Sequence, residues 1–240
     1  MGTRQMPDKF VLFDIDGTLL HCGSSARESL AQAVSEVSGH SIELQIEDVA
    51  GSTDLGIMRH ALQRAGFTDG ELEQQVAQAG STYLEIVKTA YPARNDQYLY
   101  PGVETLLARL AARPDVRLGL LTGNLYEGAR VKLDPFDIWD YFAMGAFGSD
   151  SADRNDLPGI ALSKAATQLG EHFTPAHTLL VGDTPRDALC ARVNDIRALI
   201  VCRRPEWLED ILPHHPFRVV NSTEDTENLF NLITNFPYEK

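Results

Sequence analysis

The chain has 240 residues, of which 43% are hydrophobic and 23% are charged, a composition typical of a globular protein with a sizeable core. Its formal net charge of −13, with no basic run to compensate it, argues against binding to nucleic acid or to an anionic membrane surface. The apolar runs are too short to cross a bilayer, the N-terminus does not resemble a signal peptide, and the 3 cysteines form no CxxC pair, so we expect a cytoplasmic protein.

Short apolar runs alternate with longer helical patterns along most of the chain, which is typical of a parallel sheet covered by helices. The runs are almost continuously apolar, as expected for strands that are buried on both faces. The predicted strands are 10–13, 117–121, 144–147, 178–181, 198–202 and 218–220. The predicted helices between and after them are 103–112, 126–133, 159–169, 187–194 and a last one that starts at Ser222.

The segment 20–95 interrupts this alternation. Apolar residues recur in it at helical spacing, a third helix is predicted over 71–89, and no run is typical of a buried strand. The sequence therefore predicts an α/β fold with a Rossmann-like three-layer core, 1–19 and 96–240, and an inserted all-helical cap domain, 20–95.

Polar side chains follow four of the predicted strands at the point where each strand ends. In open α/β sheets, ligands bind outside the carboxyl ends of the strands, so these side chains should lie close together. In chain order they are Asp14-Ile15-Asp16-Gly17-Thr18, Thr122-Gly123-Asn124, the loop 148–158 with Arg154, and Gly182-Asp183-Thr184-Pro185-Arg186-Asp187.

These residue types suit the transfer of a phosphoryl group. Asp14 can attack phosphorus to form an aspartyl-phosphate, and Asp16 can protonate the leaving oxygen and later deprotonate the attacking water. Hard oxygen ligands for Mg²⁺ are available from Asp14, Asp183 and Asp187. The phosphoryl oxygens can be bound by the remaining members of the set, Thr122, the N–H groups of Gly123 and Asn124, and Arg154.

Each of these signals has a simpler interpretation when it is taken alone. Asp-Gly between apolar runs also predicts a hairpin, and Thr122-Gly123-Asn124 or Gly182-Asp183 could be a plain turn into a helix. Arg154 could be a solvated loop residue. The occurrence of all four signals, in order and each at a strand end, favours a common site.

The residues from Phe10 to about Cys202 resemble the haloacid dehalogenase-like hydrolase superfamily, with a layout similar to that of phosphoglycolate phosphatase-like enzymes. Asp14-Ile15-Asp16-Gly17-Thr18 is similar to its DxDGT motif, Thr122 to its second-strand Thr or Ser, and 182–187 to its GDxxxD motif. The resemblance implies the Rossmann-like core, the helical cap and a Mg²⁺ cofactor. It also implies that Asp16 joins the metal ligands Asp14, Asp183 and Asp187 through its backbone carbonyl.

The chain departs from the family pattern in three places. Arg154 stands where the family usually has a Lys in the third-strand loop, and the two residues are not equivalent in geometry. Ser52 replaces a common basic residue of the cap, and the segment 21–25 lacks an acidic residue that is often present there. The last two departures concern the substrate rather than the chemistry.

The predicted function is a Mg²⁺-dependent phosphatase for a small phosphorylated metabolite, such as a phosphoglycolate-like compound or a sugar phosphate, in a monomer or a homodimer. A phosphomutase of the same superfamily would use the same core residues, so it stays open, as does a non-catalytic regulator that retains the fold. Specificity should reside in the cap, where the candidates are Arg27, Ser52, Asp54 and Arg59.

Overall fold

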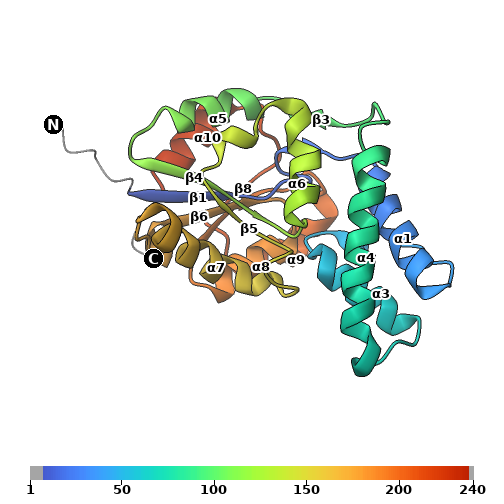
Figure 1. Ribbon diagram of the computed structural model, residues 1–240. Helices are drawn as coiled ribbons and strands as arrows, with labels where there is room; N and C mark the ends of the chain where they lie inside the picture. Colours follow the sequence, from blue (N-terminus) through green and yellow to red (C-terminus); the bar gives the residue numbers. More distant parts are fainter. Residues whose placement is uncertain (1–7, 238–240) are drawn as a thin grey trace.

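A computed structural model describes residues 8–237 and contains a central six-stranded sheet. All of its strand pairs are parallel, and the order is β5-β4-β1-β6-β7-β8 (Figure 1). The two central strands, β1 and β6, are completely buried, in agreement with their continuous apolar sequences. The strands are β1 Lys9–Phe13, β4 Val116–Thr122, β5 Gly145–Phe147, β6 Thr178–Gly182, β7 Arg197–Val201 and β8 Arg218–Val220. The predicted parallel sheet is confirmed.

Helices cover both faces of this sheet and complete a three-layer core (Figure 1). One face packs against α5 Val103–Ala111, α6 Tyr126–Leu133 and α10 Thr226–Thr234, and the other packs against α7 Leu157–Lys164, α8 Pro185–Val193 and α9 Leu208–Ile211. Alternate residues of β1 serve the two layers, since Val11 and Phe13 lie in one apolar cluster and Phe10 and Leu12 in the other.

Local hydrogen bonds set helix ends that the apolar pattern did not locate. Helix α8 begins at Pro185, because Thr184 and Asp187 form a capping box. Helix α10 begins at Thr226 with Asp225 as its N-cap, so the predicted start at Ser222 was wrong. Helix α7 continues into one π-helical turn, and six 3₁₀ turns complete the core at 134–136, 139–141, 154–156, 175–177, 205–207 and 212–214.

The inserted segment forms four helices that lie beyond one edge of the core (Figure 1). They are α1 Ser25–Ser38, α2 Ile46–Val49, α3 Asp54–Arg64 and α4 Asp69–Ala90, and they surround an apolar cluster of their own. We refer to them as the cap helices.

A small antiparallel sheet joins the cap helices to the core. It pairs β2 Leu20–His21 with β3 Tyr98–Leu99, so the chain leaves the core and returns to it at the same place. The sequence did not predict these two strands, because each has only two residues. The proposed domain bounds, 1–19 with 96–240 and 20–95, remain a prediction that this pairing supports.

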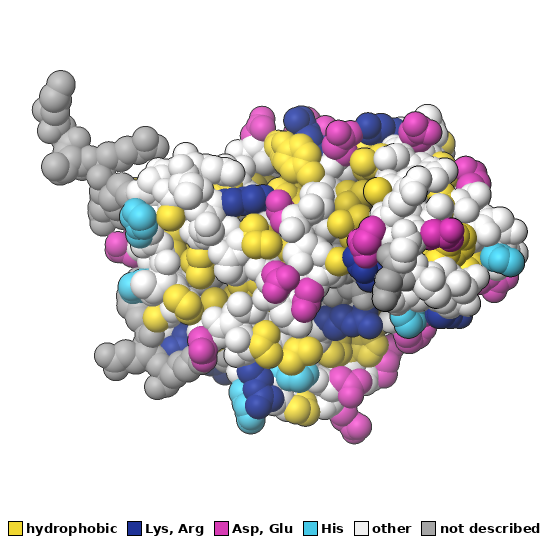
Figure 2. Space-filling model, turned by 60° about the horizontal axis from the view of Figure 1, so that its bottom comes forward, with side chains coloured by type: hydrophobic (Ala, Val, Ile, Leu, Met, Phe, Trp, Pro, Cys, Tyr) yellow, Lys and Arg dark blue, Asp and Glu magenta, His cyan; other side chains and the backbone are white. Residues whose placement is uncertain are grey.

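The surface charge is dispersed. Figure 2 shows acidic side chains scattered over one face of the molecule rather than gathered into a continuous patch. None of the helices within residues 8–237 is both long enough and apolar enough to cross a membrane.

Candidate active site

The strand ends identified in the sequence converge on one cavity between the core and the cap helices. The cavity has a volume of about 210 Å³. Its core side contains the predicted site residues Asp14, Asp16, Thr122, Gly123, Asn124, Arg154 and Asp183. Residues that are separated by up to 169 positions in the sequence therefore contribute to a single site, as expected for the carboxyl edge of a parallel sheet.

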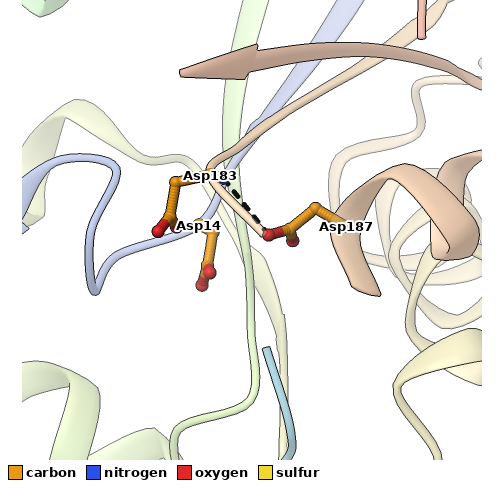
Figure 3. Close-up of side chains that lie close together, drawn as sticks. All are labelled: Asp14, Asp183 and Asp187. Carbon is orange, nitrogen blue, oxygen red and sulfur yellow. Dashed lines mark hydrogen bonds between the residues drawn. The ribbon is translucent and has the colours of Figure 1, made fainter. Parts of the chain in front are cut away.

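Three buried aspartates lie together at this site, and two of them, Asp14 and Asp183, line the cavity. One carboxylate oxygen of each of Asp14, Asp183 and Asp187 lies within 4.8 Å of the others. In Figure 3 the side chains of Asp14 and Asp183 point in the same direction, whereas the carboxylate of Asp187 turns toward the backbone of Asp183. Gly17 permits this arrangement with a φ of +82°, because a Cβ there would lie 2.1 Å from Asp183 Oδ2.

Asp187 uses both of its carboxylate oxygens within the protein. Oδ2 accepts hydrogen bonds from the backbone N–H groups of Asp183 and Thr184, at 3.2 and 3.0 Å, and from the Thr184 hydroxyl at 2.6 Å. Oδ1 accepts a bond from Arg154 Nη2 at 2.5 Å. Asp187 thereby fixes the loop that carries Asp183, and Oδ1, which accepts one hydrogen bond, retains a lone pair that a metal could use.

Arg154 supplies the positive charge at the centre of the aspartate cluster. Its side chain is 6% exposed, and Nη2 also lies 3.2 Å from Asp14 Oδ2. Nε is buried and has no hydrogen-bond partner among residues 8–237. Lys164, the other cation near this loop, instead pairs with Asp150 at 2.6 Å.

The cluster contains more negative charge than its own cation offsets. Burial raises the pKa of Asp14 to about 7; Arg154 opposes this rise, whereas Asp187 and Asp16 add to it. Burial and the charges of Asp187 and Asp14 also raise the pKa of Asp183 well above its usual range. Carboxylate oxygens that lie close together with an excess of negative charge form a suitable site for a divalent cation such as Mg²⁺. The residues present therefore fit the expected metal.

Asp16 is held by a separate cation that the sequence analysis did not identify. Lys132 Nζ donates to Asp16 Oδ2 at 2.7 Å and to Asn124 Oδ1 at 2.6 Å. Asn124 Nδ2 in turn donates to Asp16 Oδ2 and to Thr122 Oγ1, both at 2.7 Å. The other oxygen, Asp16 Oδ1, is buried and receives no hydrogen bond from a nitrogen or hydroxyl group of the described residues.

The charge of Lys132 determines the ionisation of Asp16. Burial alone would raise the pKa of Asp16, but the Lys132 ammonium, with hydrogen bonds from Lys132, Asn124 and the Cys22 thiol, lowers it below its usual range. Burial also raises the pKa of Cys22 far above its usual range, so this cysteine is a neutral thiol.

The signal that could have revealed Lys132 lies in helix α6. The buried face of this helix consists of Gly128, Ala129, Lys132 and Leu133, so the lysine occupies an apolar stripe. A lysine with a side chain that is 4% exposed needs a buried anionic partner. The sequence does not show which carboxylate that partner is, because Asp16 lies 116 positions away.

The cap helices are docked on the core through the start of α3. Thr53 Oγ1 donates to the Ala152 carbonyl at 2.6 Å, and Asp54 N donates to the Gly123 carbonyl at 2.7 Å. Asp54 Oδ2 accepts from Leu125 N at 2.8 Å. Gly123 permits this approach, since a Cβ there would lie 1.9 Å from the Ser52 carbonyl oxygen.

The cap side of the cavity is mainly apolar. It contains Ala26, Leu30, Ile46, Val49 and Ile57, together with the predicted cap candidates Arg27, Ser52 and Asp54. Arg59 is not one of the lining residues and forms an exposed ion pair with Glu73. From the core, Arg203 also reaches the cavity, where its guanidinium lies 3.5 Å above the ring of Tyr100 and Nε donates to the Gly17 carbonyl.

A family model for haloacid dehalogenase-like hydrolases matches residues 9–195, the range that contains the aspartate cluster together with Asp16, Thr122, Lys132 and Arg154. The chain belongs to this family. It is similar to the phosphoglycolate phosphatase of Cereibacter sphaeroides, with 28% identity over 85% of this chain and 90% of that protein. It is also similar to the phosphoglycolate phosphatase of Rhodospirillum rubrum, with 26% identity over 80% of this chain and 79% of that protein.

Solved structures of the family share this fold. A predicted phosphatase from Clostridium acetobutylicum superimposes with a TM-score of 0.70 and 18% identity, covering 96% of this chain and 99% of that one. A haloacid dehalogenase-like family hydrolase from Streptococcus pneumoniae gives a TM-score of 0.65 and 18% identity, with coverages of 92% and 98%. The family and its phosphatase relatives identify the chain as a phosphoric monoester hydrolase of the phosphoglycolate phosphatase-like branch.

Proposed function

We propose that this hydrolase is a Mg²⁺-dependent phosphatase that cleaves a small phosphorylated metabolite through an aspartyl-phosphate on Asp14. The observation that carries the proposal is the convergence of Asp14, Asp183 and Arg154 beneath a cavity of about 210 Å³, with Asp16 at its wall. The free cysteines Cys22, Cys190 and Cys202 are consistent with a reducing cytoplasm as its location.

The residues of the site take successive roles in this reaction. Thr122 and the N–H groups of Gly123 and Asn124 bind the phosphoryl oxygens, and Arg154 orients Asp14 for attack on phosphorus. Asp16 gives a proton to the leaving oxygen and later takes one from water. Asp14 and Asp183, with the Asp16 backbone carbonyl and with Asp187 behind them, would hold Mg²⁺, which supplies charge neutralisation when it is bound.

The size and the walls of the cavity limit the substrate. A volume of about 210 Å³ accommodates a small ester, and the docked cap leaves no room for a folded phosphoprotein or a nucleic-acid end. Arg27 and Arg203 place positive charge at the cavity wall, which favours a leaving group that is itself anionic.

The test is a panel of small phosphate esters assayed with Mg²⁺ and after exhaustive chelation. We expect hydrolysis of at least one metabolite with Mg²⁺ and a loss of at least about 10²-fold on chelation, because the aspartate cluster then repels the phosphoryl group. A bisphosphate activator should not increase turnover, since such a requirement would indicate a phosphomutase. Full activity after chelation would contradict the proposal.

Arg27→Ala should alter the relative rates among substrates, because Arg27 lines the cavity on its cap side and bonds to the Leu44 carbonyl at 2.5 Å. We expect a roughly 10-fold rise in KM for esters with an anionic leaving group and little change for p-nitrophenyl phosphate. Arg59→Ala is the matched control, because Arg59 lies on the same group of helices but outside the cavity. Equal effects on every substrate would rule out a role of Arg27 in specificity.

A further inference from the structure

The network around Asp16 holds one of its carboxylate oxygens with two hydrogen bonds. Oδ2 accepts from Lys132 Nζ and from Asn124 Nδ2, both at 2.7 Å, whereas Oδ1 receives no hydrogen bond from a nitrogen or hydroxyl group of the described residues. Two bonds at one oxygen fix the plane of the carboxylate. The Asp16 carboxylate, whose side chain is 31% exposed, is therefore held in a fixed orientation at the wall of the cavity, which Asp16 lines.

Lys132 is itself rigidly placed. Its side chain is 4% exposed and belongs to the buried face of helix α6. Its Nζ donates to Asn124 Oδ1 at 2.6 Å. Asn124 also bonds to Thr122 Oγ1, so the network connects Asp16 with the residue at the end of β4 that is proposed to bind phosphoryl oxygens. The network thus links Asp16 to a residue that is proposed to bind the phosphoryl group.

We propose that Lys132 is a positioning residue that holds the Asp16 carboxylate in place as the general base for the second half of the reaction, the hydrolysis of the aspartyl-phosphate. The inference rests on the proposed function. In this step, the oxygen of water forms a bond to phosphorus, and the bond between phosphorus and the carboxylate oxygen of Asp14 breaks. Asp14 recovers its carboxylate, the proton of water passes to the carboxylate of Asp16, and inorganic phosphate leaves.

The ion pair explains why this half of the reaction is the one that depends on Lys132. A general base must lie within hydrogen-bond reach of the attacking water, and the contacts from Lys132 and Asn124 fix where the Asp16 carboxylate lies. Formation of the aspartyl-phosphate from an ester with a good leaving group, such as nitrophenolate, requires no proton from Asp16. For such a substrate, the loss of Lys132 should slow only the second step.

The experiment measures both steps with p-nitrophenyl phosphate in Mg²⁺ buffer. In Lys132→Met, we expect nitrophenolate to appear in a burst of about one equivalent per active site, with a burst rate within about 3-fold of the wild-type rate of formation. The steady-state rate should then fall about 10²-fold, the usual contribution of a general base. Intact-protein mass spectrometry after acid quench should show the mass of one added phosphoryl group.

Matched variants separate this role from a structural one. Arg130→Met removes a cation from the exposed side of the same helix and should leave both steps unchanged. Lys132→Arg should recover part of the steady-state rate, because it keeps the charge. In an Asp16→Asn background, the change Lys132→Met should have no further effect on the second step. This double variant also removes the half-buried carboxylate that loses its cation in the single variant and could impair its folding.

The outcomes that overturn the proposal are distinct from those that overturn the proposed function. If formation and hydrolysis slow equally, or if only the KM of carboxylate-bearing substrates rises, Lys132 does not act through Asp16 in the second step. If wild type becomes phosphorylated on Asp14 and Lys132→Met turns over equally fast, the inference alone fails. If wild type hydrolyses esters without phosphorylation of Asp14, the proposed function fails and the inference fails with it.

Discussion

Asp14→Asn should lower kcat for every phosphate ester by at least about 10³-fold, because the amide cannot form the covalent intermediate. Asp14 closes strand β1, is 4% exposed and lies 3.2 Å from Arg154, so the isosteric amide should fit without displacing its neighbours. The measurement is steady-state turnover together with the mass of the acid-quenched protein, which should show no phosphoryl group on the variant.

The control for this change is Asp210→Asn on helix α9, where the side chain is exposed. It removes the same charge from the surface and should leave kcat unchanged. The melting temperature of Asp14→Asn without metal should stay near that of wild type. Turnover of any ester at close to the wild-type rate would show that Asp14 is not the nucleophile.

Arg154→Met should destabilise the metal-free protein by about 3–5 kcal/mol, the usual cost of removing one partner from a buried ion pair. Asp14 and Asp187 would then share a buried cluster with Asp183 and no cation among the side chains that contact them. Urea denaturation without metal measures this loss. Activity should fall as well, and Arg154→Lys should retain part of it, because the charge is kept and the two-nitrogen geometry is lost.

Mg²⁺ should restore more stability to Arg154→Met than it adds to wild type, because the cation replaces the missing charge. The matched control is Arg117→Met, which breaks the half-buried pair with Glu171 away from the cavity. That variant should lose stability by an amount that Mg²⁺ does not change. If Mg²⁺ affects both variants equally, Arg154 does not balance the charge of a metal-binding cluster.

The core could be predicted from the sequence because its strands are buried on both faces. All five residues of β1 and all five of β6 are buried, and the runs 10–13 and 179–181 within them are continuously apolar. Strands β2 and β3 gave no such signal, since two residues are too few to form a recognisable apolar run. The start of α10 was misplaced because Ser222 and Asp225 are both suitable N-caps, and only the fold selects between them.

The candidate site was predictable where chemistry follows a strand and not where it lies on a helix. Asp14, Thr122 and Asp183 occupy strand ends, so the topology alone brings them to one edge. Lys132 approaches from helix α6, and its partner depends on how that helix packs. The choice between Arg27 and Arg59 as cap candidates likewise needed the three-dimensional arrangement, because both lie in amphipathic helices.

Because the cap is docked on the loop that holds Thr122, closure of the cap and binding of a ligand to this loop depend on each other. Gly123 accepts a hydrogen bond from Asp54 through its carbonyl and is one of the residues proposed to donate its N–H group to the phosphoryl oxygens. A ligand that orders this loop in its present shape favours closure of the cap. Closure strengthens the binding of that ligand by the same free energy. Inorganic phosphate, the product, would share this coupling, so opening of the cap should weaken its binding and favour its release.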